Sequence, residues 1–225
     1  MYKVMLMTTS AIPPTPSRAD YLDNGPRQMA WLNADEPIAL FETWLAKAGE
    51  TEPSDPNAMS LATVDAAGQP DLRIVLLKGL SQDGFVFYTN ANSAKGQQLE
   101  ACPKAALCFH WKSWKRQVRI RGRVEAVSTA ESDAYFAGRA RGSRIGAWAS
   151  DQSQPVASRE ELVDAVQAVE AQYEEQDVPR PPHWFGWRVV PEAIEFWQDG
   201  AFRLHDRIVF TKIDEGDWTR TRLFP

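Results

Sequence analysis

The sequence predicts a mainly β protein, an antiparallel β-barrel with helices packed on its outside. Three observations support this fold class. Short apolar runs with strand periodicity occupy residues 59–127 and 187–223, and turn-forming residues separate them. Segments with helix-capping signals lie before and between these two regions. This order of β-meander, helices and β-hairpin is typical of an antiparallel barrel with peripheral helices.

The length and composition fit one large domain. The chain has 225 residues, 44% of them hydrophobic, which is enough apolar material for a core. Residues 1–17, which include the proline-rich run Ile12–Pro16, are expected to be a disordered tail. Residues 18–225 are expected to form a single domain.

The charge and the cysteines exclude several function classes. A net charge of −5 argues against general affinity for nucleic acid or for an anionic membrane, and no apolar run approaches the length of a membrane span. Cys102 and Cys108 are too few for a disulfide scaffold and lack metal-ligand spacing. We therefore expect a cytoplasmic protein and predict no metal site.

The N-terminal half begins with one clear helix and continues as strands. Asp35 is expected to cap this helix and Pro37 to lie in its first turn. Its apolar stripe consists of Ile38, Phe41, Trp44, Leu45 and Ala48. The strands expected next are Met59–Val64, Leu72–Leu80 and Phe85–Thr89, joined by turns at Asp65–Gly68 and Gln82–Gly84.

Further helices are predicted from their capping residues. Ser93 should cap a short helix that ends at Ala101, and the capping boxes Ser128–Glu131 and Ser158–Glu161 should start two more. The remaining expected strands are Ala105–Trp111, Gln117–Val127, Trp187–Val190, Ile194–Trp197, Phe202–Phe210 and Trp218–Leu223.

The expected strand Phe202–Phe210 gathers positive charge on one face. Strand residues alternate in direction, so Arg203, His205 and Arg207 should point the same way. Aligned like charges repel unless solvent or an anion lies between them. A solvated sheet face would explain the charges alone. The large aromatic neighbours and the titratable histidine favour instead a planar, anionic ligand.

Two clusters in the first half of the chain could also bind an anion. Arg73 and Lys78 bracket an apolar strand, although charges at strand ends are common. Ser93 and Lys95 stand at a helix start just after Tyr88–Asn90. A helix N-terminus with a lysine suits a phosphate, but serine caps and first-turn lysines also occur without one.

A third cluster lies between the two capping boxes. Tyr135 and Arg139 are four residues apart and share a helix face if the helix extends that far. Ser143 could bring a hydroxyl to the same anion, followed by a polar turn in Ile145–Ser153. The alternative is a helix end whose basic residues complement its dipole.

The basic stretch Lys112–Arg123 includes a tryptophan, as some nucleic-acid sites do. As a strand it would be amphipathic, with four polar residues on one face and apolar residues on the other. The polar residues are Gln117, Arg119, Arg121 and Arg123. A nucleic-acid role is therefore set aside, and His110 and His183 are assigned structural roles.

Several motifs, in order along the chain, resemble the pyridoxamine 5′-phosphate oxidase family. They are RIVLLK at 73–78, FYTN at 87–90, Ser-x-Lys at 93–95, RQV at 116–118, YFxxRxRGSxIGAWAS at 135–150, the dipeptide QS at 152–153, IEFWQxGxxRLHDR at 194–207 and RLFP at 222–225. The resemblance extends from about Arg18 to the last residue.

The resemblance implies an FMN-binding split β-barrel that forms a homodimer with FMN at the subunit interface. The cofactor residues it implies are Arg73, Ile74, Val75, Leu76, Lys78, Tyr88, Thr89, Ser93, Lys95, Gln117, Gln152, Ser153, Trp197 and Arg207. The substrate residues it implies are Lys78, Tyr135, Arg139 and Ser143 at the phosphate, and Arg203 and His205, as the catalytic pair, at the pyridine ring. Arg18 and Tyr21 resemble an N-terminal arm over the substrate.

The same resemblance implies an enzyme of vitamin B6 salvage. It would oxidise pyridoxamine or pyridoxine 5′-phosphate at C4′ to pyridoxal 5′-phosphate, with dioxygen reduced to hydrogen peroxide. Separate basic clusters agree with this, because FMN and the vitamer each carry a phosphate. Two alternatives stay open: a split-barrel flavin oxidase acting on another ring, such as a phenazine precursor, and a non-catalytic carrier of pyridoxal phosphate or flavin. Ala94, where the family usually has arginine, leaves the carrier open.

Overall fold

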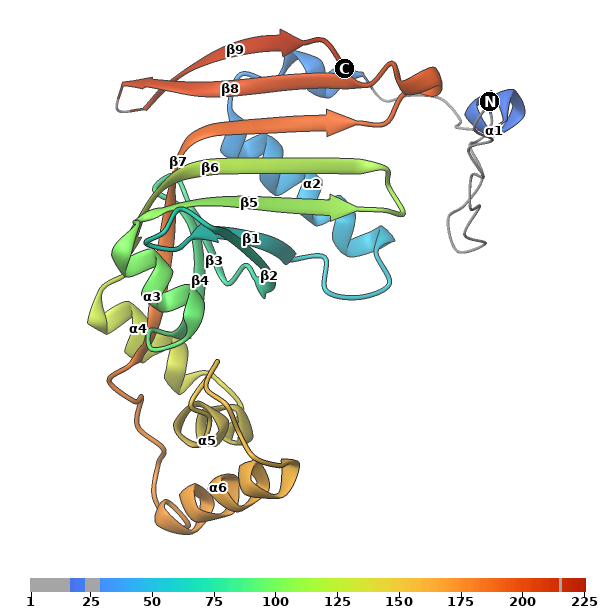
Figure 1. The fold of residues 1–225 in the computed structure, drawn as a ribbon. Coiled ribbons are helices and arrows are strands. Elements are labelled where there is room, and N and C mark those ends of the chain that lie inside the picture. The colour runs from blue at the N-terminus through green and yellow to red at the C-terminus, as the bar shows by residue number, and fades with distance from the viewer. Residues whose placement is uncertain (1–16, 23–28, 215) are drawn as a thin grey trace, which may run out of the picture.

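The computed structural model describes residues 17–22, 29–214 and 216–225, and it is built on one nine-stranded sheet (Figure 1). Of the expected N-terminal tail, residues 1–16 lie outside the described residues. The strands are β1 (Ala58–Val64), β2 (Pro70–Leu76), β3 (Gly79–Ser81), β4 (Gly84–Asn90), β5 (Lys104–Trp111), β6 (Arg116–Ala126), β7 (Trp184–Gln198), β8 (Asp206–Asp214) and β9 (Asp217–Leu223). The helices are α1 (Arg18–Leu22), α2 (Pro37–Thr51), α3 (Ala94–Ala101), α4 (Thr129–Ala137), α5 (Arg141–Ala149) and α6 (Arg159–Gln172), with 3₁₀ turns η1 (Ala30–Asn33) and η2 (Ala201–Arg203).

The sheet curls into a half-barrel whose neighbouring strands are all antiparallel. Their order is β2-β1-β5-β6-β7-β4-β3, and β8 and β9 extend the sheet from the second half of β7. Burial alternates along β6, so Val118 and Ile120 are fully buried while Arg119 and Arg121 are exposed. The predicted mainly β fold with peripheral helices, and the amphipathic strand within it, are confirmed.

Helix α2 lies across one face of the sheet and supplies much of the core (Figure 1). Phe41 packs edge-on against Phe85 and Phe109, with ring centroids 5.0 and 4.9 Å apart, and both Phe41 and Trp44 are almost fully buried. The predicted cap at Asp35 is wrong. The helix begins one residue later, after Glu36, whose side chain makes no capping bond.

The long strand β7 joins two regions that the sequence predicts as separate strands. Pro191 cannot donate a ladder hydrogen bond, yet the strand continues past it because β6 shifts register between Arg121 and Gly122. Gly122 is required at this bulge, since a Cβ there would lie 1.9 Å from the Val190 carbonyl oxygen. The predicted strand Leu72–Leu80 is divided in turn into β2 and β3.

The strand predicted over Phe202–Phe210 is wrong in its first part. Residues Ala201–Arg203 form the 3₁₀ turn η2, and β8 begins only at Asp206. Phe202 and Arg203 have φ angles of +56° and +66°, in the left-handed region, which a strand does not allow. Arg203, His205 and Arg207 therefore do not share one face of a single strand, because only Arg207 belongs to β8.

Helices α3 to α6 lie at the end of the sheet away from β8 and β9 (Figure 1). The predicted serine caps are confirmed: Ser93, Ser128 and Ser158 each accept a hydrogen bond from the amide three residues later. Helix α5 was not predicted. No helix in the described segments has the length and apolar character needed to cross a membrane.

Candidate active site

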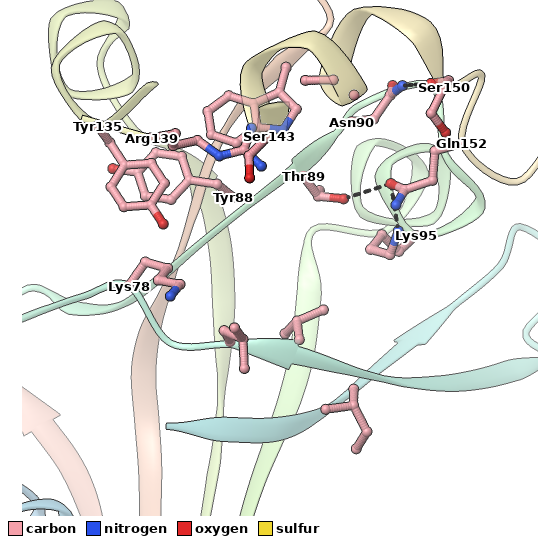
Figure 2. Close-up of a pocket in the computed structure, with 16 residues that line it drawn as sticks. Lys78, Tyr88, Thr89, Asn90, Lys95, Tyr135, Arg139, Ser143, Ser150 and Gln152 are labelled. Atoms are coloured by element: carbon pink, nitrogen blue, oxygen red, sulfur yellow. Dashed lines mark hydrogen bonds between the residues drawn. The ribbon is translucent and has the colours of Figure 1, made fainter. Parts of the chain in front are cut away.

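A pocket of about 510 Å³ opens where β2, β4 and the start of β7 meet helices α3, α4 and α5 (Figure 2). Its volume lies in the range typical of small-molecule sites. It is lined by Ile74, Val75, Leu76, Lys78, Tyr88, Thr89, Asn90, Lys95, Tyr135, Arg139, Ser143, Gly146, Ala147, Ser150, Gln152 and Trp184.

One end of the pocket is a polar cluster at the N-terminus of α3. Lys95 Nζ donates hydrogen bonds to Ser93 Oγ (3.1 Å) and to Gln152 Oε1 (3.0 Å), and Thr89 Oγ1 donates to the same Gln152 oxygen (3.1 Å; Figure 2). Burial, together with the charge of Arg73, lowers the pKa of Lys95. Two of the three ammonium protons are used, so one remains for a ligand.

Arg73 lies beside this cluster but does not line the pocket. Its guanidinium donates to Thr63 Oγ1 (2.5 Å) and Gln98 Oε1 (3.0 Å) and forms an ion pair with Asp71 (2.5 Å). Gln98 and Arg73 lower the pKa of Asp71 through a hydrogen bond and through charge. Arg73 is therefore held tightly close to Lys95.

The other end of the pocket combines cations with aromatic rings. Tyr88 and Tyr135 stack with centroids 3.9 Å apart, and the Tyr88 ring also stacks on Trp184 at 5.3 Å. The Arg139 guanidinium lies 4.7 Å from the Trp184 centroid, while its buried Nη1 atom has no hydrogen-bond partner among the described residues. Gly186 is needed behind this stack, since a Cβ there would lie 2.7 Å from Tyr88 Cε1.

Helix α5 forms one wall of the pocket because of its spacing. Ser143, Gly146, Ala147 and Ser150 recur at helical intervals and line the pocket. The opposite face is anchored to the segment after α6: Arg144 pairs with Asp177 at 2.5 Å, Trp148 Nε1 donates to the Pro179 carbonyl at 2.7 Å, and Arg141 donates to the Tyr173 carbonyl. The segment that follows α6 thus fixes the wall from behind.

Three predicted cofactor residues form a separate group near β8 rather than lining the pocket. Gln117, Trp197 and Arg207 are cross-strand neighbours on β6, β7 and β8. Arg207 Nε donates to Glu195 Oε1 at 2.8 Å, and Arg119 pairs with the other oxygen of the same carboxylate. Burial alone would raise the pKa of Glu195, but the hydrogen bonds from Arg207 and Arg119 outweigh it and lower the pKa.

The predicted catalytic pair lies next to this group. The His205 ring lies 4.7 Å from Trp197, and its Nδ1 atom lies 3.1 Å from the Gly200 amide nitrogen and 3.3 Å from Asp199 Oδ1. Arg203 is exposed on the strained turn η2. Helix α1, which carries Arg18 and Tyr21, lies against η2 (Figure 1).

Known proteins match the chain over nearly its whole length. A family model described as "Pyridoxamine 5′-phosphate oxidase" matches residues 45–173, and one described as "Pyridoxine 5′-phosphate oxidase C-terminal dimerisation region" matches residues 184–225. The chain belongs to the pyridoxamine 5′-phosphate oxidase family. The predicted family membership is confirmed.

Individual relatives agree with this assignment. The pyridoxine/pyridoxamine 5′-phosphate oxidase of Hyphomonas neptunium is 57% identical over 220 residues, which cover 97% of this chain and 100% of the relative. That of Mesorhizobium japonicum is 59% identical over 195 residues, covering 87% of this chain and 95% of the relative.

Solved structures share the fold. A PhzG protein from Burkholderia lata, in complex with tetrahydrophenazine-1-carboxylic acid, superposes with a TM-score of 0.82 at 29% identity, covering 89% of this chain and 98% of that one. A pyridoxamine 5′-phosphate oxidase-related, FMN-binding protein from Nostoc punctiforme has a TM-score of 0.68 at 16% identity, covering 85% and 100%. At that identity the likeness shows the fold alone.

The structure brings together most of the predicted pocket residues and adds several to them. Four predicted substrate residues and seven further cofactor residues line the pocket, while Ser93 lies directly behind Lys95 and Ser153 follows Gln152 in an exposed turn. The lining residues not predicted as site residues are Asn90, Gly146, Ala147, Ser150 and Trp184. The small residues at helical spacing from 143 to 150 were a signal that could have revealed three of them.

Proposed function

We propose that this chain oxidises pyridoxine or pyridoxamine 5′-phosphate at C4′ to pyridoxal 5′-phosphate, using FMN and dioxygen. One observation carries the proposal: a single pocket holds two sets of cations at different ends. Lys95, with Arg73 beside it, stands at one end, and Arg139 with Lys78 at the other (Figure 2). Two sets of cations suit two phosphate-bearing molecules bound side by side.

The residues present fit FMN. The Lys95 ammonium, the N-terminus of α3 and Thr89 can hold its phosphate, and Arg73 adds charge from close by. The apolar strand residues Ile74, Val75 and Leu76 can support the ring system, and Tyr88 and Gln152 line the same pocket. Ser93 supports Lys95 from behind, and Ser153 follows Gln152 in an exposed turn from which it can reach the cofactor. When bound, FMN supplies a hydride acceptor at the ring and passes the electrons to dioxygen, with hydrogen peroxide as the product.

The aromatic end of the pocket fits the phosphate of the substrate. Arg139 presents the buried Nη1 donor without a partner, Lys78 has no ion pair among the described residues, and Ser143 and Tyr135 add hydroxyls. A dianion placed there satisfies the orphaned donor and offsets the burial of the guanidinium. The reacting carbon then lies between the two phosphate sites, oriented by both.

The pocket of one chain lacks the predicted catalytic pair, so we propose a homodimer in which the partner supplies it. Residues 184–225 match a dimerisation region, and this segment carries Arg203, His205, Trp197 and Arg207. The edge strand β2 also exposes Leu72 and Ile74, which are 63% and 64% accessible in the single chain. In the assembly Arg203 stacks on the pyridine ring, where its charge favours the transition state, and His205 orients the substrate.

The N-terminal arm and the cellular location extend the proposal. Helix α1, which carries Arg18 and Tyr21, contacts η2, so this arm can close over a ring held by Arg203. Both cysteines are free thiols, as a cytoplasmic enzyme would have them.

Oxygen consumption tests the proposed function. The purified protein should be yellow, and with pyridoxine or pyridoxamine 5′-phosphate it should take up dioxygen over many turnovers and release one hydrogen peroxide per aldehyde formed. A dihydrophenazine carboxylic acid serves as the comparison substrate, given the PhzG structure. Oxidation of the phenazine alone, or vitamer binding without repeated turnover, would overturn the proposal in favour of a phenazine oxidase or a carrier.

A further inference from the structure

Trp184, which was not predicted as a site residue, contacts four residues at the aromatic end of the pocket. It is the first residue of β7 and is only 6% exposed, yet it lines the pocket. One face of the pocket therefore depends on a ring whose role is unassigned. Its neighbours are Tyr88 (ring centroids 5.3 Å apart), Phe136 (5.1 Å), Tyr135 (6.1 Å) and the Arg139 guanidinium (4.7 Å).

The ring is fixed by its backbone as well as by packing. The Trp184 amide donates to the Pro181 carbonyl at 3.0 Å, and the Trp184 carbonyl accepts from Arg180 Nη1 at 2.8 Å. Arg180 is itself held by Asp133 of α4 through a 2.6 Å ion pair. The same helix supplies Phe136, which meets Trp184 edge-on, so α4 is bound to the start of β7 by both an ion pair and a ring contact.

The contact between Trp184 and Arg139 stabilises the charge of a partly buried guanidinium. Burial lowers the pKa of Arg139, because a charged guanidinium loses hydration inside the pocket. A carboxylate partner would restore the charge but would occupy its donors and compete with an anionic ligand. An aromatic face attracts the cation without accepting any of its in-plane N–H groups, which stay available for a phosphate.

We infer that Trp184 is a positioning residue: it holds the Arg139 guanidinium over its ring so that the donors face the substrate phosphate. The inference rests on the proposed function, since that function assigns Arg139 to the phosphate. Trp184 acts through Arg139 and takes no part in the oxidation itself. Its removal should therefore weaken recognition of the phosphorylated substrate and leave the maximal rate and FMN binding largely unchanged.

A double-mutant cycle on the FMN-loaded protein tests this inference. The variants are Trp184→Leu, Trp184→Phe, Arg139→Leu and the combinations of each tryptophan variant with Arg139→Leu. The readouts are KM and kcat for pyridoxine 5′-phosphate, and the dissociation constant of the same compound measured anaerobically by titration of the flavin spectrum. Trp187→Leu is the matched control, because Trp187 is a similarly buried tryptophan of β7, 8% exposed, that packs on Phe185 rather than on an arginine.

Trp184→Leu should raise KM and the dissociation constant about tenfold, and Trp184→Phe by about threefold, because phenylalanine keeps a weaker aromatic face. In the Arg139→Leu background the same changes should have less than about a twofold effect. Equal effects in both backgrounds, or a loss seen in kcat or FMN affinity rather than in KM, would overturn the inference. If Trp184→Leu does not fold, the Trp184→Phe arm gives the same test.

Different results would contradict the proposed function and this inference. A wild-type protein that binds pyridoxine 5′-phosphate but does not oxidise it would contradict the proposed function, while the cycle would still be read from the dissociation constants. A Trp187→Leu variant that raises KM as much as Trp184→Leu would show a general packing effect and overturn the role of Trp184.

Discussion

The pocket and the region around β8 hold their cations in opposite ways. In the pocket, Lys95 donates to neutral oxygens and Arg139 lies on an aromatic ring, and neither has a carboxylate partner among the described residues. Near β8, Arg207 and Arg119 share the carboxylate of Glu195, and Arg222 pairs with Asp206 at 2.6 Å. Cations without a carboxylate attract an anionic ligand, whereas paired ones chiefly fix the shape of their surroundings.

Two arginines depart from this contrast in informative ways. Arg73 is ion-paired although it lies beside the pocket, so its charge stands in a fixed position next to the proposed phosphate site. Arg203 belongs to the β8 region but forms no ion pair there among the described residues, and its backbone is held in the left-handed conformation. A strained, exposed arginine of this kind favours a ligand contact over a structural role.

The largest effect is expected from Arg203→Leu. Turnover should fall by about 100-fold or more, because the charge that favours the transition state is lost, while FMN affinity should change little. The measurements are kcat with pyridoxine 5′-phosphate and a fluorescence titration of FMN. Arg123→Leu, an exposed arginine on the outer face of β6, is the control. Turnover close to the wild-type value would remove Arg203 from the catalytic role.

A smaller effect is expected at Lys95, which has hydrogen bonds but no carboxylate partner among the described residues. Lys95→Met should raise the dissociation constant of FMN by about 10- to 100-fold, since a charge-assisted contact to phosphate is lost. Burial lowers the pKa of Lys95, so its ammonium loses the proton at a lower pH than free lysine does, and wild-type FMN affinity should fall as the pH rises toward 10.5. The exposed residue Lys104 provides the control, as Lys104→Met. An unchanged FMN affinity would contradict the placement of the cofactor phosphate.

The smallest effect is expected in the paired region. Glu195→Gln should lower the free energy of unfolding by about 1–2 kcal/mol at pH 7, because Arg207 and Arg119 lose their shared partner. The folded-state pKa of Glu195 is lowered, so this stabilisation is complete above its ordinary pKa of 4.5 and is lost as the pH falls further. Denaturant titrations at pH 7 and below 4.5 should show the difference between wild type and variant shrinking in acid. A difference that grows in acid would show that the carboxylate is not the stabilising group.

Short-range patterns in the sequence predicted much of the fold. The serine caps of α3, α4 and α6 depend on residues three positions apart, and the two-sided character of β6 depends on simple alternation. The conformation of residues 202–203 was missed because nothing in their composition signals left-handed backbone angles, which neighbouring elements impose.

The sequence by itself determined the fold class, the family and the residues of the two cationic sets. Motif order and local periodicity can be read along the chain without knowledge of any long-range contact. Only the tertiary structure decided which groups share a pocket. It brings Thr89 and Gln152 within 3.1 Å across 63 positions of sequence and places Trp184 under Arg139. It also places Arg203 on η2, outside the residues that line the pocket of the same chain. The physical reason is that such contacts come from the packing of helices on a curled sheet, where distance along the chain no longer predicts distance in space.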